Sequence, residues 1–410
     1  GEMAMEIRVP DPGPDWGQCL LYIDEGGVMS WHFDIAPAVA ADTNRGRQGE
    51  RTYRIRRRVA ESTTAAKSRG LTGAIGKKLI QVLAFALIDP VTGMVGDHFV
   101  NLWEKKKRAH GFRTFTPDNY NFGNTAVSPD WGRLKTGDNA LLLVHGTNSR
   151  SHVAFEGLSR EFVEELHRRY QGRVFAFDHP TLSFSPIENA AWFFENIACH
   201  RLNFDIICHS RGGLVSRLLA ERSGDFPGGP QKIEVNKTIF VAAPNSGTIL
   251  TDANYMGDFI DAYTNILNFF PDNGITDALE GIITVAKQLS MGTLKGLAGL
   301  QAMRPKGSFL RELNTPSQAK PSYYAFASNY EPSEPGFRTY AINLLTDQIF
   351  KAKNDLVVPT GGVYEGNGSN LFPIRKKRLL DSTAGVAHTR FFHQEQVRKD
   401  ILEWLSTPVH

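Results

Sequence analysis

The sequence predicts an α/β fold with a mostly parallel central sheet, preceded by a smaller β-rich unit, and three observations support this. From about residue 136 onward, short apolar segments alternate with segments of helical periodicity, as in a parallel sheet with helical crossovers. Around Ser210, an apolar strand runs into a turn of small residues and then into a helix. Before this part the pattern is that of antiparallel strands. We therefore expect two units, residues 1–135 and residues 136–410.

The first unit contains three segments that favour β-strands. Residues 52–56 alternate between polar and apolar side chains, residues 79–88 form an apolar run, and residues 98–103 form a third strand-like run. They predict an antiparallel β unit, and they contain no catalytic constellation. Residues 116–137 are rich in Pro, Asn, Asp and Gly, which indicates a linker.

The second unit has the pattern of a parallel sheet. Buried strands are expected at residues 140–144, 173–177, 204–208, 237–242 and 323–327. Helices are expected between them at residues 153–169, 187–200 and 214–222. Residues 250–315 carry helical periodicity and no strand pattern. They therefore predict a helical insertion between two strands of the sheet.

The turn around Ser210 is the most informative motif. Residues 206–215 read Ile-Ile-Cys-His-Ser-Arg-Gly-Gly-Leu-Val. A tight strand–turn–helix junction of this kind lifts a serine hydroxyl out of the end of the strand, with the usual pattern Gly-x-Ser-x-Gly. Cys208 stands at the first glycine position and Gly212 at the second. Ser210 is therefore the candidate nucleophile, and the alternative is a glycine-rich turn that carries an ordinary serine.

Two further segments supply groups that such a serine needs. An apolar strand ends in His145-Gly146, and we expect the backbone amides of Thr147 and Arg211 to stabilise a developing oxyanion. Asp355 follows Ser210 and the strand at residues 323–327, as the chain order of this fold requires, and it would orient a histidine. Asp347 is its nearest competitor, and a turn aspartate that caps its own backbone is the alternative interpretation.

The histidine is expected on a loop before the last helix. His388 fits this position better than His393, because Gly385 to Ala387 permit a close approach and His393 lies at the start of the helical pattern. Ser246, in the loop after residues 238–242, is a rival nucleophile, but it lacks the strand–turn–helix setting.

Taken in order, these segments resemble the lipase- and esterase-like branch of the α/β-hydrolase superfamily, especially its intracellular deacylase type with a helical lid. The resemblance covers residues 138–410. It implies a serine hydrolase that cleaves carboxylic esters, lipid or acyl esters in particular, through Ser210, His388 and Asp355 and an acyl-enzyme. It also implies that no cofactor or metal is needed. Residues 250–315 would then form a lid whose Leu294 and Leu297 contact the acyl chain.

Three alternatives stay open at this point. The same machinery serves a thioesterase or an amidase. The protein could also be an effector that attacks membrane phospholipid, or a non-catalytic binding protein on a hydrolase scaffold. Acyl-chain length, head group, oligomeric state and the role of the N-terminal unit are not fixed by the sequence.

Composition restricts partners and location. A net charge of +3 on 410 residues does not indicate nucleic-acid binding, and three cysteines form no disulfide framework. No segment reaches the roughly 18 apolar residues of a membrane span. Residues 1–5 lack the features of a signal peptide, so we expect a cytoplasmic protein, with a removed signal left open. The basic clusters at residues 54–58 and 375–378 are expected to be solvated, and peripheral contact with anionic lipid is the alternative.

Overall fold

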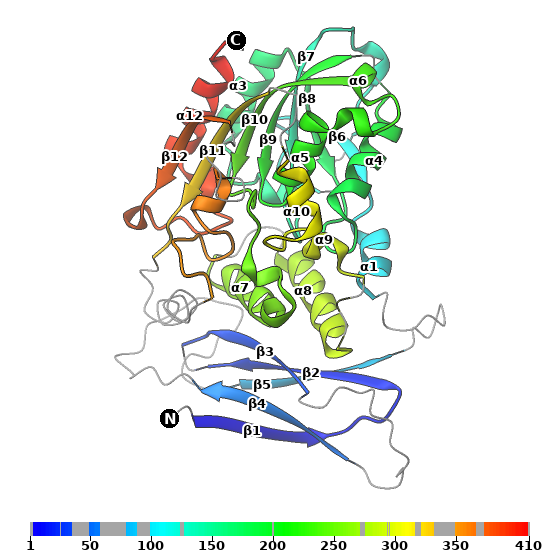
Figure 1. The fold of residues 1–410 in the computed structure, drawn as a ribbon, viewed down its shortest axis with the longest axis vertical. Coiled ribbons are helices and arrows are strands. Elements are labelled where there is room, and N and C mark those ends of the chain that lie inside the picture. Colours follow the sequence, from blue (N-terminus) through cyan, green and yellow to red (C-terminus); the bar gives the residue numbers. More distant parts are fainter. Residues whose placement is uncertain are drawn as a thin grey trace.

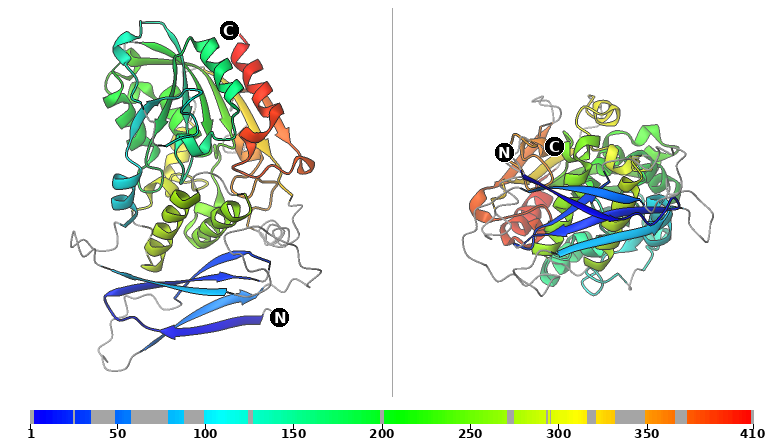
Figure 2. Two further views of the ribbon diagram at one scale, coloured as in Figure 1. Left: turned by 180° about the vertical axis from the view of Figure 1, so that it is seen from behind. Right: turned by 90° about the horizontal axis from the view of Figure 1, so that it is seen from below.

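The computed structural model places a large sheet at one end of the molecule and a group of N-terminal strands at the other (Figure 1). The residues that it describes are 3–24, 26–34, 49–57, 79–87, 99–123, 127–198, 201–270, 275–292, 294, 296–315, 321–331, 349–365 and 373–408. Helices α7 (Met256–Phe269) and α8 (Ile275–Ser290) lie between the two ends, and Figure 2 shows the same arrangement from behind.

The large sheet has seven strands. Their order is β12 (Ile374–Leu380), β11 (Ser322–Ser328), β10 (Ile233–Val241), β9 (Leu202–His209), β7 (Asn139–Val144), β8 (Val174–Asp178) and β6 (Gly111–Thr114). All neighbours are parallel except β6, which pairs antiparallel with β8. This mostly parallel sheet with helical crossovers is an α/β-hydrolase fold, and each of the five predicted strands overlaps one of β7 to β11.

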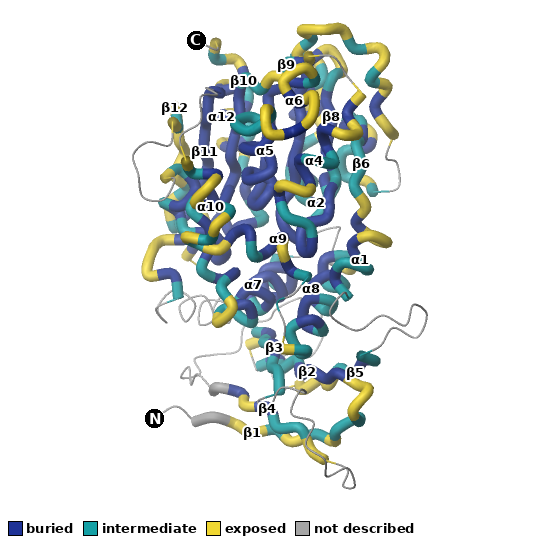
Figure 3. Tube along the Cα trace, turned by 45° about the vertical axis from the view of Figure 1, so that its right-hand side comes forward, coloured by how far each residue is buried: buried dark blue, intermediate teal, exposed yellow. Residues whose placement is uncertain are grey.

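Both faces of the sheet are covered by helices, and this explains the continuous apolar strands. Leu141 and Leu143 of β7 pack on the face covered by α3 (Arg160–Tyr170) and α12 (Glu395–Ser406). Leu142 and Val144 point to the opposite face, where α4 (Pro186–Asn196) and α5 (Gly212–Glu221) pack. Figure 3 shows these strands as the buried centre of the molecule. A strand buried on both faces needs apolar residues at every position.

The predicted helical insertion is confirmed. Between β10 and β11 the described residues form α7, α8, α9 (Ala298–Gln301) and α10 (Ser308–Leu313), with two short 3-10 turns, Ile249–Thr251 and Ala253–Tyr255. Among the described residues, no helix combines the length and the apolar character needed to cross a membrane.

Two sequence expectations differ from the structure at the start of this unit. Residues 98–103 were expected as a strand, but α1 is a helix over Phe99–Lys107. The expectation was wrong because the apolar run is short, whereas Val100 and Glu104, four residues apart, are buried on one helical face. The Glu104 carboxylate accepts hydrogen bonds from the amides of Thr181 and Leu182, at 2.6 and 2.8 Å, and so fixes the loop after β8.

The central sheet also begins earlier than the sequence boundary at residue 135. β6 lies ahead of that boundary, yet it forms the edge of the sheet beside β8. The polar segment at residues 116–137 follows it, and within that segment Trp131 packs on Phe112 and Phe175. The other edge strand, β12, was not predicted from the sequence because its Ile-Arg-Lys-Lys-Arg-Leu-Leu sequence is dominated by exposed basic residues. Such residues protect an edge strand from further pairing.

The N-terminal strands are antiparallel, as predicted. β1 (Met3–Pro10) pairs with β4 (Glu50–Arg57). β2 (Trp16–Ile23) lies between β3 (Met29–Phe33) and β5 (Leu79–Ala86) in a separate three-stranded sheet.

Edge strand β3 is hydrogen-bonded to helix α7. The Met29 amide donates to the Asn265 side-chain oxygen at 2.9 Å, and the Asn265 amide group donates back to the Met29 carbonyl at 2.8 Å. The Trp31 amide donates to Asp261 at 2.7 Å, and its indole N–H donates to Thr264 at 3.0 Å. Burial raises the pKa of Asp261 well above its usual value. The polar face of α7 thus satisfies backbone groups that an edge strand otherwise exposes.

Candidate active site

Ser210 occupies a strained turn between β9 and α5. Its φ angle is +52°, a left-handed conformation that is uncommon for a residue other than glycine. The Ser210 amide donates to the Val241 carbonyl at 2.9 Å, and the Ser210 carbonyl accepts from the Gly213 amide at 2.9 Å. Such a conformation costs about 1–3 kcal/mol and persists only where the surroundings hold it, as they do here.

The turn requires glycine after the serine but not before it. A Cβ atom at Gly212 would lie 2.4 Å from the carbonyl oxygens of Val144 and His145. Cys208, at the first position of the motif, fits because its side chain is fully buried and its thiol donates to the Ile239 carbonyl at 3.4 Å. Burial raises the pKa of this thiol to about 12, so it stays protonated and unreactive at neutral pH.

Gly212→Ala should destabilise the fold. The added methyl group meets rigid backbone, so we expect the free energy of unfolding to fall by about 1–3 kcal/mol, the usual penalty for overpacking. Urea denaturation measures this value. Gly224→Ala is the control, because a Cβ there meets nothing within 4 Å. Equal stability of the two variants would contradict the packing argument.

The structure brings three of the predicted residues into one hydrogen-bonded row, Ser210–His388–Asp355. The Ser210 hydroxyl lies 2.9 Å from His388 Nε2, and His388 Nδ1 lies 2.8 Å from Asp355 Oδ2. An ionised carboxylate only accepts, so Nδ1 carries the proton and Nε2 is free to accept from the serine hydroxyl. This is the tautomer that a general base needs.

Asp355 is held in two ways. One carboxylate oxygen accepts from the amides of Val357 and Val358, at 3.0 and 2.7 Å, and the other faces His388. The residue therefore caps its own turn and orients the histidine, so the two interpretations of its role are compatible. The His388 amide donates to the Asp355 carbonyl at 3.1 Å, which joins the two loops. Asp347, the competitor, lies outside the described residues.

The other candidates make different contacts. His209 Nε2 lies 2.9 Å from the His388 carbonyl, and burial lowers the pKa of His209 to about 3, so the ring is neutral and donates to that carbonyl. His393 and His388 line one cavity, which is described below. Burial lowers the pKa of His393 to about 4, but no hydrogen bond joins it to Ser210 in the described part of the chain. The Ser246 hydroxyl donates to the Glu365 carbonyl, and no histidine bonds to it among the described residues.

The two predicted oxyanion donors flank the serine. A Cβ at Gly146, next to Thr147, would lie 2.5 Å from the Ser210 Cβ, so the loop after β7 touches the turn. Within the described ranges, neither the Thr147 amide nor the Arg211 amide donates a hydrogen bond. The loop is fixed by Asn148, whose amide donates to the Thr181 hydroxyl at 2.9 Å and whose side chain donates to the Ala278 carbonyl at 2.8 Å.

The Arg211 side chain has a second role that the sequence did not suggest. Its guanidinium is fully buried, donates to the Gly299 carbonyl at 3.0 Å and also bonds the Phe184 carbonyl. Burial lowers its pKa to about 10, so it remains charged at neutral pH. The residue after Ser210 therefore ties the turn to α9 of the helical insertion.

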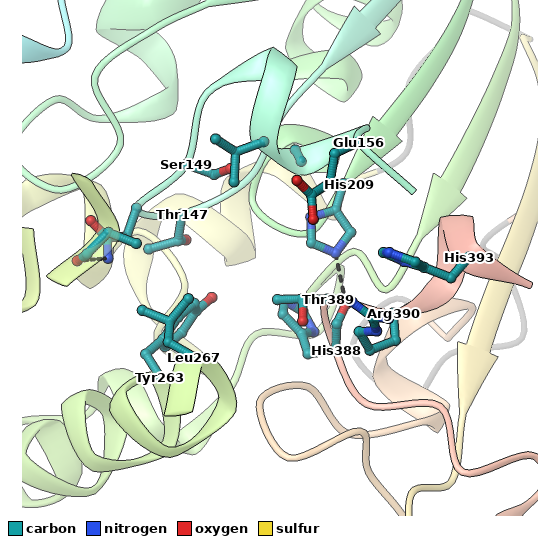
Figure 4. A pocket seen from close by; sticks show the side chains of 14 residues that line it. Thr147, Ser149, Glu156, His209, Tyr263, Leu267, His388, Thr389, Arg390 and His393 are labelled. Carbon is teal, nitrogen blue, oxygen red and sulfur yellow. Dashed lines mark hydrogen bonds between the residues drawn. The ribbon is translucent and has the colours of Figure 1, made fainter. Parts of the chain in front are cut away.

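The insertion covers the site closely. A cavity of about 40 Å³ separates His209 and His388 from Tyr263, Leu267 and Ala278 of the insertion (Figure 4). Only 1% of Ser210 is exposed. This volume accommodates little more than one water molecule, whereas pockets for small ligands span about 300–1,000 Å³. The structure therefore has its site closed.

Leu294 and Leu297 do not line this cavity in the part of the chain that the structure describes. Leu297 is completely buried, and both side chains pack in the large core. They differ from the expectation because an apolar stripe that faces the core has the same period as one that faces a ligand. In their place, Tyr263, Leu267 and Ala278 form the wall.

Tyr263 is the residue that sequence analysis missed. Its hydroxyl lies beside the side chains of Ser210 and Thr147, and its ring packs edge-on against His388 with centroids 6.2 Å apart. Burial raises its pKa above the usual value. The sequence offers no signal for it, because a tyrosine in the apolar stripe of a helix is normally a core residue.

A family model described as a domain of unknown function (DUF7379) matches residues 107–406. Similar solved structures include lipase 1 from Pelosinus fermentans, with 14% identity over 67% of this chain and 100% of that chain and a TM-score of 0.46. The Staphylococcus hyicus lipase shows 13% identity over 68% and 98%, with a TM-score of 0.40. An esterase from Thermogutta terrifontis shows 12% over 66% and 90%, with a TM-score of 0.34. No curated protein sequence matches the chain.

Proposed function

The chain belongs to the DUF7379 family, whose description names no reaction, and from its site we propose that it is a serine hydrolase that cleaves carboxylic esters. The observation that carries the proposal is the Ser210–His388–Asp355 row on a strained turn, near two backbone amides that donate to no other described residue. Among the described residues, no three His, Cys, Asp or Glu side chains are grouped to hold a metal ion.

The first half-reaction forms an acyl-enzyme. His388 Nε2 takes the proton of the Ser210 hydroxyl as its oxygen attacks the ester carbonyl. The resulting imidazolium is stabilised by Asp355 through Nδ1–H. Negative charge develops on the carbonyl oxygen, and the amides of Thr147 and Arg211 are its proposed donors. His388 then protonates the leaving alcohol.

The second half-reaction uses the same groups in the same order. Water gives a proton to His388 and attacks the acyl-enzyme, and the oxyanion forms again at the two amides. His388 returns the proton to Ser210 as the acid leaves. A neutral His209, bonded to the His388 carbonyl, keeps the histidine loop in place without adding a competing charge.

The cavity lining favours acyl esters as substrates. Leu267 and Ala278 of the insertion, with Val153 and Ala154, give the cavity an aliphatic part beside polar lining residues such as Glu156 and Arg390. The closed volume of about 40 Å³ holds no acyl chain, so α7 and α8 must move before one binds. Each methylene that is then buried contributes up to about 0.8 kcal/mol. These observations support the proposal that residues 250–315 act as a lid.

Fluorophosphonate labelling and a series of esters test this proposal. We expect the wild-type protein to be labelled at Ser210 and to prefer octanoyl over acetyl esters in kcat/KM. Leu267→Ser should reduce that preference about tenfold while sparing acetyl hydrolysis, since it makes one wall polar. Leu294→Ser, in the same insertion but away from the cavity, is the matched control.

The outcomes separate the open alternatives. Thioester and amide analogues assayed beside the esters identify the bond that is cleaved. Absence of labelling together with absence of turnover would instead support a non-catalytic binding protein. Equal kcat/KM values for acetyl and octanoyl esters would contradict the proposal that the insertion contacts the acyl chain. They would not affect the assignment of Ser210 as the nucleophile.

A further inference from the structure

Thr147, His388 and Tyr263 line one cavity, His388 bonds Ser210, and Tyr263 belongs to the proposed lid. The loop after β7 contributes Thr147, the histidine loop contributes His388, and α7 contributes Tyr263 (Figure 4). The phenol of Tyr263 is close enough to Ser210 and Thr147 to interact with both side chains. Its ring stands edge-on to His388, at an interplanar angle of 77°. Tyr263 is thus placed by its hydroxyl, which interacts with Ser210 and Thr147, and by its ring, which packs on His388.

The hydroxyl does not fill the proposed oxyanion site. If it stood there, the amides of Thr147 and Arg211 would donate to it. Neither amide donates a hydrogen bond to any described residue, and the interactions of the Tyr263 hydroxyl at this end are with side chains. The phenol therefore does not occupy the position between the two amides, and it interacts with the side chains of Ser210 and Thr147 instead.

The hydroxyl is also in the correct state to donate. Ser210 donates its proton to His388 Nε2, so its oxygen has lone pairs left to accept from a second O–H. Burial raises the pKa of Tyr263, so the phenol keeps its proton throughout the neutral range. A phenol that interacts with the serine side chain before reaction lies close to the place where the oxyanion forms, because that oxyanion forms on the carbon to which the serine oxygen bonds.

The helix that carries Tyr263 is held from the other side. Asp261, Thr264 and Asn265 bond β3 at Met29 and Trp31, while Tyr263 faces the site. Donors stabilise an oxyanion most when they are fixed in advance, since no reorganisation is then needed during the reaction. The contact with the N-terminal sheet supplies that fixation.

We propose that the Tyr263 hydroxyl is a third donor to the oxyanion, supplied by the lid and present only when the lid is closed over a bound substrate. This inference rests on the proposed hydrolase function and deepens it. The two backbone amides belong to the rigid sheet unit, whereas the phenol arrives with α7. Closure over the substrate and completion of the site are then the same event, which favours substrates that let the lid close.

Tyr263→Phe tests the inference, with kcat and KM measured on butyryl and octanoyl esters. We expect kcat to fall about 10²-fold, the effect of losing one oxyanion donor, with KM changed less than about threefold. The affinity for a trifluoromethyl ketone, which forms a tetrahedral adduct with an active-site serine, should fall by a similar factor. Tyr255→Phe, which removes a phenol just ahead of α7, is the matched control and should match the wild type.

The contrary outcomes are distinct. If the kcat of Tyr263→Phe equals that of the wild type, the inference is overturned. A higher kcat would also overturn it, because it would show that the phenol hinders the substrate. If the wild type neither hydrolyses esters nor reacts with a fluorophosphonate, the proposed function fails and this inference fails with it. If Tyr263→Phe does not fold, 3-fluorotyrosine at position 263 replaces it. The more acidic hydroxyl should then raise kcat, and an unchanged kcat would overturn the inference.

Discussion

Ser210→Ala should abolish measurable ester hydrolysis, with kcat lowered by about 10⁶-fold, the loss found when a nucleophile of this type is removed. The substitution removes only the hydroxyl group. His388 Nε2 then has no serine proton to accept. The turn itself should persist, because it is held by backbone hydrogen bonds to Val241 and Gly213. The measurement is kcat with an octanoyl ester, together with fluorophosphonate labelling of the purified variant.

The control for this experiment is Ser246→Ala. Ser246 also follows a strand of the central sheet, but its hydroxyl donates to the Glu365 carbonyl. We expect kcat and labelling close to those of the wild type. Labelling of the Ser210→Ala variant at the wild-type rate would contradict the assignment of Ser210 as the nucleophile. Loss of labelling in Ser246→Ala would identify Ser246 as the nucleophile instead.

Asp355→Asn should lower kcat by about 10⁴-fold while the fold is retained. The remaining amide oxygen can still accept from the Val357 and Val358 amides, so the turn keeps its cap. The amide N–H₂ then faces His388 Nδ1, which must become the acceptor. The imidazole proton moves to Nε2, and the ring can no longer take the proton of Ser210.

The pair of measurements here is kcat and the thermal melting temperature. Asp381→Asn is the control, since Asp381 caps its own exposed turn through Thr383 and lies outside the site. It should leave kcat within a factor of about two. If Asp355→Asn lowers kcat by less than tenfold while the melting temperature is unchanged, another carboxylate orients His388.

The sequence predicted most of the sheet and the candidate catalytic row because local patterns carry that information. Apolar runs buried on both faces mark β7 to β11. The order of Ser210, Asp355 and His388 along the chain is the one that this fold requires of a catalytic set. It failed at α1, where only tertiary burial of Glu104 distinguishes a helix from a strand, and at β12, whose basic residues resemble a loop. Leu294 and Leu297 pack in the large core of the closed structure, so their contact with an acyl chain stays a prediction.

Tyr263 illustrates a different limit. Its proximity to Ser210 depends on how α7 is placed over the sheet, and that placement depends on side chains of α7 that meet a strand more than two hundred residues earlier. Contacts between such distant segments leave no periodic pattern in either one. Residues that act through the position of a whole helix are therefore found only from the structure.

If residues 250–315 act as the proposed lid, the hydrogen bonds between α7 and β3 decide which parts of the molecule move with it. If α7 left β3 behind, the Asn265 side-chain oxygen would lose the Met29 amide and the Asp261 carboxyl would lose the Trp31 amide, at about 1–3 kcal/mol for each group left buried and unsatisfied. Displacing the N-terminal strands together with the helix avoids that penalty. Entry of substrate is then a rigid-body motion of a whole structural unit, on the microsecond-to-millisecond timescale of domain motions. Solvent viscosity and any molecule bound to the N-terminal strands would therefore change the turnover rate at Ser210, although neither touches the serine.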